Sequence, residues 1–205
     1  LGADILTESN YKKIGGFNVT VPFKQKVIPY LDEITPEAKE TQSVNTICLG
    51  ANGTVGHNTD IDGFEISIKK LNYDVKDKTI IILGAGGVVP SIIYALKKMN
   101  ASKIILSNRT KEKAEALKKI FKDINVLDWG EIVDFDMIIN ATSLGLKEND
   151  KFGIDFTKAG RNKLYYDVIY EPYNTEFSGA ASFAGNAYEN GLNMFLFQAQ
   201  KAFNI

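Results

Sequence analysis

The stretch Thr79-Ile80-Ile81-Ile82-Leu83-Gly84-Ala85-Gly86-Gly87 decides the fold of this chain. Its first half is an almost wholly aliphatic run of strand length, which is typical of a parallel strand covered on both faces. The glycines carry no Cβ atom, so the backbone after the strand can turn tightly and approach a phosphate closely. Val88–Met99 then has apolar residues on one helical face. This order of strand, glycine turn and helix predicts the first unit of a nucleotide-binding α/β sheet.

Strand and helix patterns continue to alternate after this unit. Lys103–Ser107, Phe135–Asn140 and Leu164–Ile169 predict further strands. Lys111–Lys122 predicts an amphipathic helix with its lysines outward, and Asn193–Phe203 predicts a closing helix. We therefore expect an α/β fold of the Rossmann type, with a doubly wound parallel sheet.

The chain before this regular section is broken into shorter pieces. Phe17–Val21 predicts a strand and Lys24–Leu31 predicts a short helix. Val44–Leu49 and Thr54–His57 flank Asn52-Gly53, which is a strong signal for a hairpin turn. The hairpin distinguishes this region from the alternating section that follows it.

The composition excludes several classes of protein. The 205 residues are 44% hydrophobic and 24% charged, which is ordinary for a soluble globular protein. The formal net charge of −1 lacks the basic excess that nucleic-acid binding needs, and no apolar run approaches the length of a membrane span. A single histidine and a single cysteine, Cys48, argue against a zinc site and exclude an intrachain disulfide. We therefore expect a protein of a reducing compartment, the cytoplasm, without metal, nucleic-acid or membrane partners.

The turn at Gly84, Ala85, Gly86 and Gly87 is the candidate pyrophosphate site. The helix after it offers free backbone N–H groups and the positive end of its dipole to a phosphate. The generic fingerprint has a small residue at position 89, where this chain has Val89, whose bulk could push the helix or the phosphate outward. The alternative is an ordinary turn with incidental glycines, which the strand-turn-helix context disfavours.

The end of the second strand of this section indicates which cofactor binds. NAD enzymes usually carry an acidic residue there, which binds the ribose hydroxyls. This chain has Asn108, Arg109 and Thr110 instead. Arg109 can pair with a 2′-phosphate and stack on adenine, and its two neighbours can add hydrogen bonds. The pattern favours NADP over NAD, the alternative being an exposed arginine in a loop.

Two polar clusters precede the glycine turn. The first, Gly16–Lys24, ends in a lysine after a proline-bounded strand, and the second, Gly56–Gly63, contains Asp60 among small polar residues. A lysine and an aspartate can together move a proton at an oxygen of a small polar ligand. Taken alone, Lys24 could be a surface lysine and Asp60 could be the N-cap of a helix.

Together these motifs resemble the shikimate dehydrogenase family. Gly16–Lys24 resembles the family's G-x-N-V-T-x-P-x-K signature and Gly56–Gly63 its G-x-N-T-D-x-x-G signature, and both signatures are highly specific. The resemblance covers nearly the whole chain in order. It continues through Ser43–Thr46, Gly84–Gly87, Asn108–Thr110, Asn140–Ser143, Asp167–Pro172, Asn190–Met194 and Gln198-Ala199.

The resemblance implies reversible, NADPH-dependent reduction of 3-dehydroshikimate to shikimate. It implies that Lys24 and Asp60 are the catalytic pair. The residues implied to hold the substrate are Thr20, Lys24, Asn45, Asp60 and Gln198. Those implied to hold the cofactor are Gly84, Ala85, Gly86 and Gly87 at the pyrophosphate, Asn108, Arg109 and Thr110 at the adenosine phosphate, and Thr142, Ser143, Val168, Gly191 and Met194 along the path to the nicotinamide.

The resemblance also implies a division into domains. We expect a partial substrate-binding domain at 1–62, an NADP-binding domain at 63–187 and a helix at 188–205 that returns to the substrate domain. The family's first strand, its serine-bearing loop for the shikimate carboxylate and its last helix have no counterpart here. We therefore expect parts of the natural protein to lie outside these residues, and we expect a monomer or a homodimer.

Three other functions remain open. A quinate/shikimate dehydrogenase would have a broader substrate range or would use NAD. A glutamyl-tRNA reductase-like or other NADP-dependent dehydrogenase would share the glycine turn and Asn108–Thr110, but the signature at Gly16–Lys24 argues against it. A non-catalytic NADP-binding module would keep the turn without needing both Lys24 and Asp60.

Overall fold

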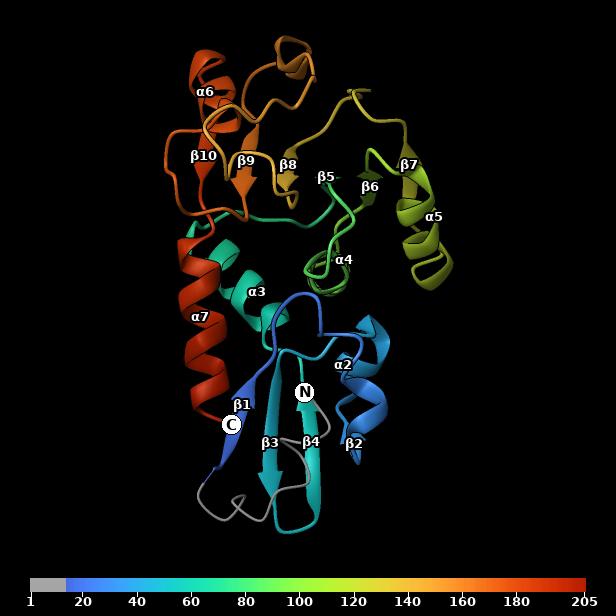
Figure 1. Cartoon of the computed structure of the whole chain (residues 1–205). Helices are drawn as coiled ribbons and strands as arrows, with labels where there is room; N and C mark the ends of the chain where they lie inside the picture. Colours follow the sequence, from blue (N-terminus) through green and yellow to red (C-terminus); the bar gives the residue numbers. More distant parts are fainter. Residues whose placement is uncertain (1–13) are drawn as a thin grey trace.

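The computed structural model describes residues 14–205 and arranges them around two β-sheets (Figure 1). The larger sheet has six parallel strands in the order β10-β9-β8-β5-β6-β7. These strands are β5 (Thr79–Leu83), β6 (Lys103–Ser107), β7 (Asn125–Leu127), β8 (Met137–Asn140), β9 (Leu164–Asp167) and β10 (Ala187–Glu189). The first three run outward from the centre and the last three run outward on the other side, which is the Rossmann order, with its switch point between β5 and β8. The predicted doubly wound parallel sheet is confirmed.

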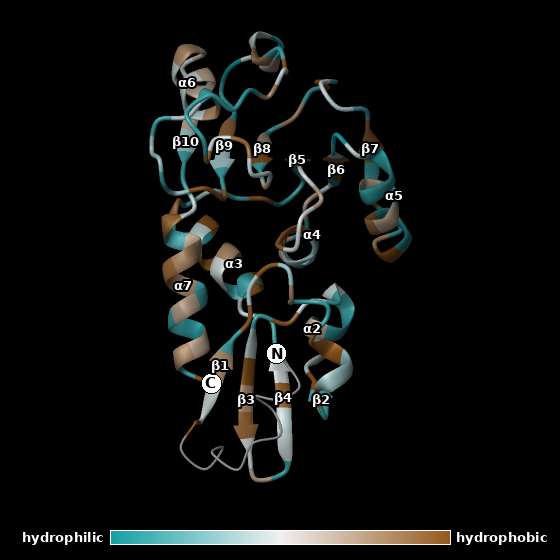
Figure 2. Cartoon of the chain, in the orientation of Figure 1, coloured by the Kyte–Doolittle hydropathy of each residue, from teal (hydrophilic) through white to brown (hydrophobic). Residues whose placement is uncertain are grey.

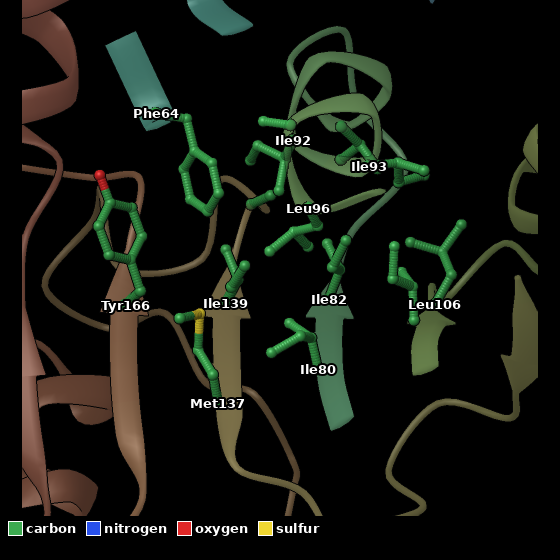
Figure 3. Close-up of a cluster of buried hydrophobic side chains, with 14 of the residues drawn as sticks. Phe64, Ile80, Ile82, Ile92, Ile93, Leu96, Leu106, Met137, Ile139 and Tyr166 are labelled. Carbon is green, nitrogen blue, oxygen red and sulfur yellow. The ribbon is translucent and has the colours of Figure 1, made fainter. Parts of the chain in front are cut away.

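Helices cover both faces of the larger sheet. They include α4 (Val89–Lys98), α5 (Lys111–Ile120), the short 3-10 helix η3 (Phe156–Ala159) and α6 (Glu176–Phe183). Alternate residues of β5 face opposite ways: Ile80 and Ile82 pack under α4 (Figure 3), whereas Ile81 and Leu83 pack against η3 and α6. Because both faces are covered, the strand is apolar at every position after Thr79. None of the helices within residues 14–205 has the length and apolar character needed to cross a membrane.

The smaller sheet has four strands in the order β1-β3-β4-β2. They are β1 (Gly16–Asn18), β2 (Glu33–Ile34), β3 (Thr46–Gly50) and β4 (Gly53–His57). β3 and β4 form the predicted antiparallel hairpin around Asn52-Gly53. The helix α2 (Pro36–Thr41), which Thr35 caps, packs its Ala38 with Ile47 of β3, where Figure 2 shows hydrophobic residues.

Two local predictions in this smaller unit were wrong. The strand expected over Phe17–Val21 ends at Asn18, and the helix expected over Lys24–Leu31 is a series of turns with a 3-10 helix, η2 (Ile28–Tyr30). Pro29 lies within that segment, lacks a backbone N–H and clashes with the preceding turn of an α-helix. Pro29 therefore disfavours an α-helix that runs through the whole segment.

Two helices connect the sheets. α3 (Asp60–Lys70) leaves the smaller sheet and places Phe64 in the core beneath the larger one, and α7 (Leu192–Phe203) packs along it (Figure 1). A Cβ atom on Gly63 would lie 2.7 Å from the carbonyl oxygen of Met194, so glycine is what allows the two helices to approach. The predicted domain boundary at 62/63 falls inside α3 and that at 187/188 falls inside β10. The boundaries themselves stay a prediction.

Candidate active site

A cleft of about 1420 Å³ lies between the two sheets. It is bordered by the segment after β1, by the turn between β5 and α4, and by α7. The predicted site residues that line it are Thr20, Lys24, Asn45, Asp60, Gly86, Gly87, Thr142, Ser143, Val168, Gly191, Met194 and Gln198. The cleft therefore brings the predicted substrate side and the predicted nicotinamide side together. Gly84, Ala85 and the segment Asn108–Thr110 do not line it.

Lys24 and Asp60 meet in this cleft. The Lys24 Nζ atom lies 2.5 Å from Asp60 Oδ2, and only 13% and 8% of the two side chains are exposed. Lys24 is therefore not a free surface lysine. The N-cap of α3 is Thr59, and Asp60 is the first helical residue, so the interpretation of Asp60 as an N-cap was also wrong. A carboxylate in a first helical turn is favoured by the helix dipole, which helps to hold it there.

The amide of Asn45 assembles the rest of the polar cluster. Its Nδ2 atom lies 2.9 Å from Thr59 Oγ1, 3.0 Å from Asp60 Oδ1 and 3.4 Å from Gln198 Oε1. Its Oδ1 atom accepts a hydrogen bond of 2.8 Å from the backbone N–H of Thr59. Residues at the start of β3, at the start of α3 and on α7 thus converge on one spot, and their side chains offer both donors and acceptors. Such a cluster suits a ligand that carries several hydroxyl groups.

The glycine turn forms the opposite side of the cleft. Gly84 has φ +110°, and a Cβ atom there would lie 2.7 Å from the carbonyl oxygen of Ala141, so only glycine fits. Gly86, Gly87 and Val88 line the cleft at the start of α4. Val89 is fully buried in the core, so its bulk points away from the space for a phosphate. The backbone N–H groups of Gly86, Gly87 and Val88 have no hydrogen-bond partner among the described residues. The turn can therefore hold a pyrophosphate with these groups, next to the positive end of the α4 dipole.

The segment Asn108–Thr110 lies at the same edge of the sheet. It follows β6, the parallel neighbour of β5, so it stands beside the glycine turn. The Asn108 amide donates a 2.7 Å hydrogen bond to the carbonyl oxygen of Thr110, which shapes the loop. Arg109 is exposed, and it forms no ion pair with another residue of the part that the structure describes. Its guanidinium is thus available to a phosphate next to the turn.

Sequence reasoning gave no role to a buried network behind the cleft. Asp167 Oδ1 accepts hydrogen bonds from Asn140 Nδ2 at 2.9 Å and from the backbone N–H of Ile169 at 2.9 Å. Asn140 Oδ1 in turn accepts one from the Thr142 hydroxyl at 2.7 Å. Burial raises the pKa of Asp167 to about 7. The network holds the loop that carries Thr142 and Ser143 into the cleft.

Two further cleft residues were also missed. Asn18 and Tyr170 line the cleft, and the Tyr170 ring stacks on Phe195 of α7 with a centroid distance of 5.2 Å. Asn18 could have been found, because it lies inside the polar stretch that ends in Lys24. Tyr170 gave no such signal from its spacing. Among residues 14–205 there is no group of three or more histidine, cysteine, aspartate or glutamate side chains placed to hold a metal ion.

A Rossmann sheet whose switch-point cleft faces a buried lysine-aspartate pair defines a nicotinamide-nucleotide-dependent oxidoreductase. Comparison with known families narrows this class. Residues 3–47 match the shikimate dehydrogenase substrate binding domain, and residues 65–147 match the shikimate / quinate 5-dehydrogenase domain. The chain belongs to the shikimate dehydrogenase family.

Relatives and solved structures agree with this assignment. The chain is 53% identical to the shikimate dehydrogenase (NADP(+)) of Pelagibacter ubique over 202 residues, which cover 98% of this chain and 76% of that protein. It resembles the crystal structure of shikimate dehydrogenase from Aquifex aeolicus, with a TM-score of 0.87, 40% identity and coverage of 94% of this chain and 72% of that one. It also resembles quinate dehydrogenase from Corynebacterium glutamicum in complex with NAD, with a TM-score of 0.90, 30% identity and coverage of 98% and 76%.

Proposed function

We propose that this protein catalyses the reversible reduction of 3-dehydroshikimate to shikimate with NADPH. The observation that carries the proposal is the Lys24–Asp60 pair, buried in a cleft whose other side is the glycine turn at Gly86 and Gly87. The relatives named as NADP(+)-dependent shikimate dehydrogenases support it. The match of residues 3–47 to a shikimate dehydrogenase substrate binding domain disfavours the glutamyl-tRNA reductase-like alternative.

The reaction adds a hydride to the carbonyl carbon and a proton to the carbonyl oxygen. NADPH supplies the hydride, and the chain supplies orientation and the proton. Lys24 Nζ would bind the carbonyl oxygen, stabilise its developing negative charge and donate or relay the proton. Asp60 holds Lys24 through Oδ2 and would bind the adjacent hydroxyl of the ring. In the reverse direction, the same pair would accept the proton from the hydroxyl.

The polar cluster around Asp60 would orient the substrate. Asn45 and Gln198 already contact each other at 3.4 Å, so a ligand hydroxyl in the cleft would meet an amide from each of them. Thr20 is exposed to the cleft and would add a hydroxyl donor. Several fixed donors and acceptors select a hydroxylated ring over an apolar one, because burying their polar groups without partners costs about 1–3 kcal/mol each.

The cofactor would lie along the edge of the larger sheet. Gly84, Ala85, Gly86 and Gly87 would hold the pyrophosphate, and Asn108, Arg109 and Thr110 the adenosine 2′-phosphate. Thr142 and Ser143 would continue this path, and Val168, Gly191 and Met194 would border the nicotinamide. We further propose a cytoplasmic enzyme that is a monomer or a homodimer.

The test is a set of parallel assays of the full-length protein with shikimate and quinate, each with NADP and NAD. We expect the highest kcat/KM with shikimate and NADP. The resemblance to an NAD-bound quinate dehydrogenase makes the opposite preference the main competing result. Cofactor binding without turnover of either substrate would instead favour a non-catalytic module.

Arg109→Ala tests the cofactor preference. Loss of a charged hydrogen-bonding partner of the 2′-phosphate costs about 1.5–3 kcal/mol, so the KM for NADPH should rise by about tenfold or more while the KM for NADH stays unchanged. Lys113→Ala is the matched control, since it removes a positive charge from an exposed site on the following helix. Equal effects of Arg109→Ala on both cofactors would contradict the assignment.

A further inference from the structure

Asn58 lies in the short link between β4 and α3, and nothing above gives it a role. It is only 5% exposed, although it carries a polar amide. It does not line the cleft. Burial of an amide is costly unless its donors and acceptors are satisfied, so its partners indicate why it is there.

The amide of Asn58 is fully satisfied by three different elements. Its Nδ2 atom lies 2.9 Å from Thr41 Oγ1 at the end of α2 and 2.9 Å from Ser91 Oγ in the first turn of α4. Its Oδ1 atom lies 3.2 Å from the backbone N of Asp60 and 3.2 Å from Ser91 Oγ. Asn58 therefore joins the smaller sheet's helix, the cofactor helix and the first residue of α3.

The orientation of the Asn58 side-chain amide is determined by its hydrogen-bond partners. The Thr41 hydroxyl donates a 2.7 Å hydrogen bond to the carbonyl oxygen of Glu37, so it can only accept from Asn58. The backbone N–H of Asp60 can only donate, so Oδ1 must face it. These two partners exclude the flipped amide, and both Thr41 and Ser91 are essentially inaccessible to water.

The helices α2, α3 and α4, which Asn58 joins, meet between the glycine turn and the Lys24–Asp60 pair. Ser91 follows the glycine turn within the first turn of α4, and α2 and α4 pack against each other beside this link (Figure 1). Asp60, whose backbone Asn58 holds, binds Lys24 with its side chain. One amide thus connects the turn that would hold the cofactor with the pair that would hold the carbonyl oxygen.

We propose that Asn58 is a positioning residue that, through Ser91, fixes the cofactor-binding turn relative to the Lys24–Asp60 pair. The proposal rests on the dehydrogenase function proposed above. Hydride and proton must reach adjacent atoms of one carbonyl group. The cofactor-binding turn and the Lys24–Asp60 pair must therefore be held at a fixed distance and orientation to each other. A misplacement of about 1 Å from a change outside the reacting atoms can cost about 10²-fold in rate.

Ser91→Ala in the full-length enzyme is the principal test. Alanine favours the helix at least as well as serine, so α4 itself should persist while its link to Asn58 is lost. We expect kcat for shikimate oxidation to fall about tenfold or more, with the KM values for shikimate and NADP changed by less than about threefold. The deuterium kinetic isotope effect measured with shikimate deuterated at the reacting carbon should rise, because poorly aligned hydride transfer becomes more rate-limiting.

Ser67→Ala is the matched control. Ser67 is also fully buried, but its hydroxyl bonds to the carbonyl oxygen of Phe64 and to the Tyr166 hydroxyl, away from the cleft. It should lose stability without a change in kcat or in the isotope effect. Equal kinetic changes in Ser67→Ala and Ser91→Ala, or an unchanged kcat and isotope effect in Ser91→Ala, would overturn the proposal.

Thr41 provides a second test that is independent of α4. Thr41→Val removes the hydroxyl that accepts from Asn58 and should lower kcat in the same way as Ser91→Ala. Thr41→Ser keeps the hydroxyl and should leave kcat close to that of the wild type. If Ser91→Ala does not fold, this pair decides: an equal kcat in Thr41→Val and Thr41→Ser would reject the proposal. A wild-type protein that turns over neither shikimate nor quinate would reject the proposed function instead, which is a separate outcome.

Discussion

Asp60 and Asp167 are both buried, and both place one carboxylate oxygen on an asparagine amide, yet their surroundings differ. Asp60 Oδ1 contacts Asn45, and its Oδ2 is bound by the Lys24 ammonium. Asp167 Oδ1 contacts Asn140, whereas its Oδ2 has no hydrogen-bond partner among the described residues. One carboxylate lies at the cleft with a cation, and the other lies behind it without one.

This difference shows that burial alone does not determine what a carboxylate does. A buried charge is tolerated when an opposite charge and hydrogen bonds compensate the loss of water. Without a cation, burial favours the neutral form, and the pKa of Asp167 rises to about 7. Asp60 is therefore placed to act together with its lysine at the cleft, whereas Asp167 helps to hold the backbone of the loop that carries Thr142 and Ser143.

The largest effect that we expect concerns the pH dependence of stability at Asp167. Burial raises the pKa of Asp167 to about 7 in the folded protein, from an ordinary value of 3.8. The folded protein thus keeps a proton that the unfolded chain has already lost, so the contribution of Asp167 to stability falls as the pH rises from about 4 to about 7. The loss approaches about 1.4 kcal/mol per pH unit, or about 4 kcal/mol in total.

Asp167→Asn isolates this effect, because the amide keeps an acceptor oxygen and cannot ionise. Urea unfolding of both proteins between pH 4 and pH 8 gives the difference in their free energies of unfolding. Other carboxylates, such as Glu65 with its lowered pKa, titrate in both proteins and cancel. If the difference between the two free energies of unfolding does not change with pH, Asp167 has no raised pKa. Its surroundings would then compensate its charge, as Lys24 does for Asp60.

Lys24→Met should give the next largest effect. Methionine has a similar length but no charge, so the change leaves Asp60 buried without its cation, as Asp167 already is. We expect kcat to fall by about 10²-fold or more, the usual scale of general acid catalysis, with cofactor affinity preserved. Steady-state assays with shikimate, and a fluorescence titration with NADPH as the binding control, measure both quantities. A kcat within tenfold of the wild type would show that the cation is not what distinguishes the two aspartates.

The sequence predicted local patterns better than long-range contacts. The strand, glycine turn and helix around Thr79–Gly87 follow from patterns within one short segment, and the fold class followed from their alternation. Lys24 and Asp60 were named from separate motifs, but their contact spans 36 positions and depends on where α3 begins. The chemistry of the two side chains suggested that they act together, and the family resemblance implied that they form the catalytic pair, but no spacing along the chain encodes their contact.

The contacts that sequence reasoning missed depend on strand order. Asn140 and Asp167 are register partners on β8 and β9, so their hydrogen bond exists only because these strands are neighbours. Asn58 and Ser91 meet because α4, which covers the larger sheet, packs beside α2 and the link between β4 and α3. No spacing along the chain encodes either contact. The wrong prediction of a helix over Lys24–Leu31 has a local cause instead, because Pro29 lies within that segment and disfavours an α-helix.

Thr142→Val should give the smallest effect and extends the comparison to the cofactor. The Thr142 hydroxyl donates to Asn140 Oδ1 and accepts from the backbone N–H of Leu144 at 2.9 Å, so it transmits the Asp167 network to the loop that lines the cleft. Valine has the same shape, and the loss of these bonds costs about 1 kcal/mol, or about a fivefold rise in the KM for NADP. The KM for shikimate should stay unchanged, because the cluster around Asp60 shares no hydrogen bond with this loop. A rise in the KM for shikimate alone would show that the Asp167 network supports substrate binding. It would contradict the idea that Asp60 serves the substrate and Asp167 the cofactor.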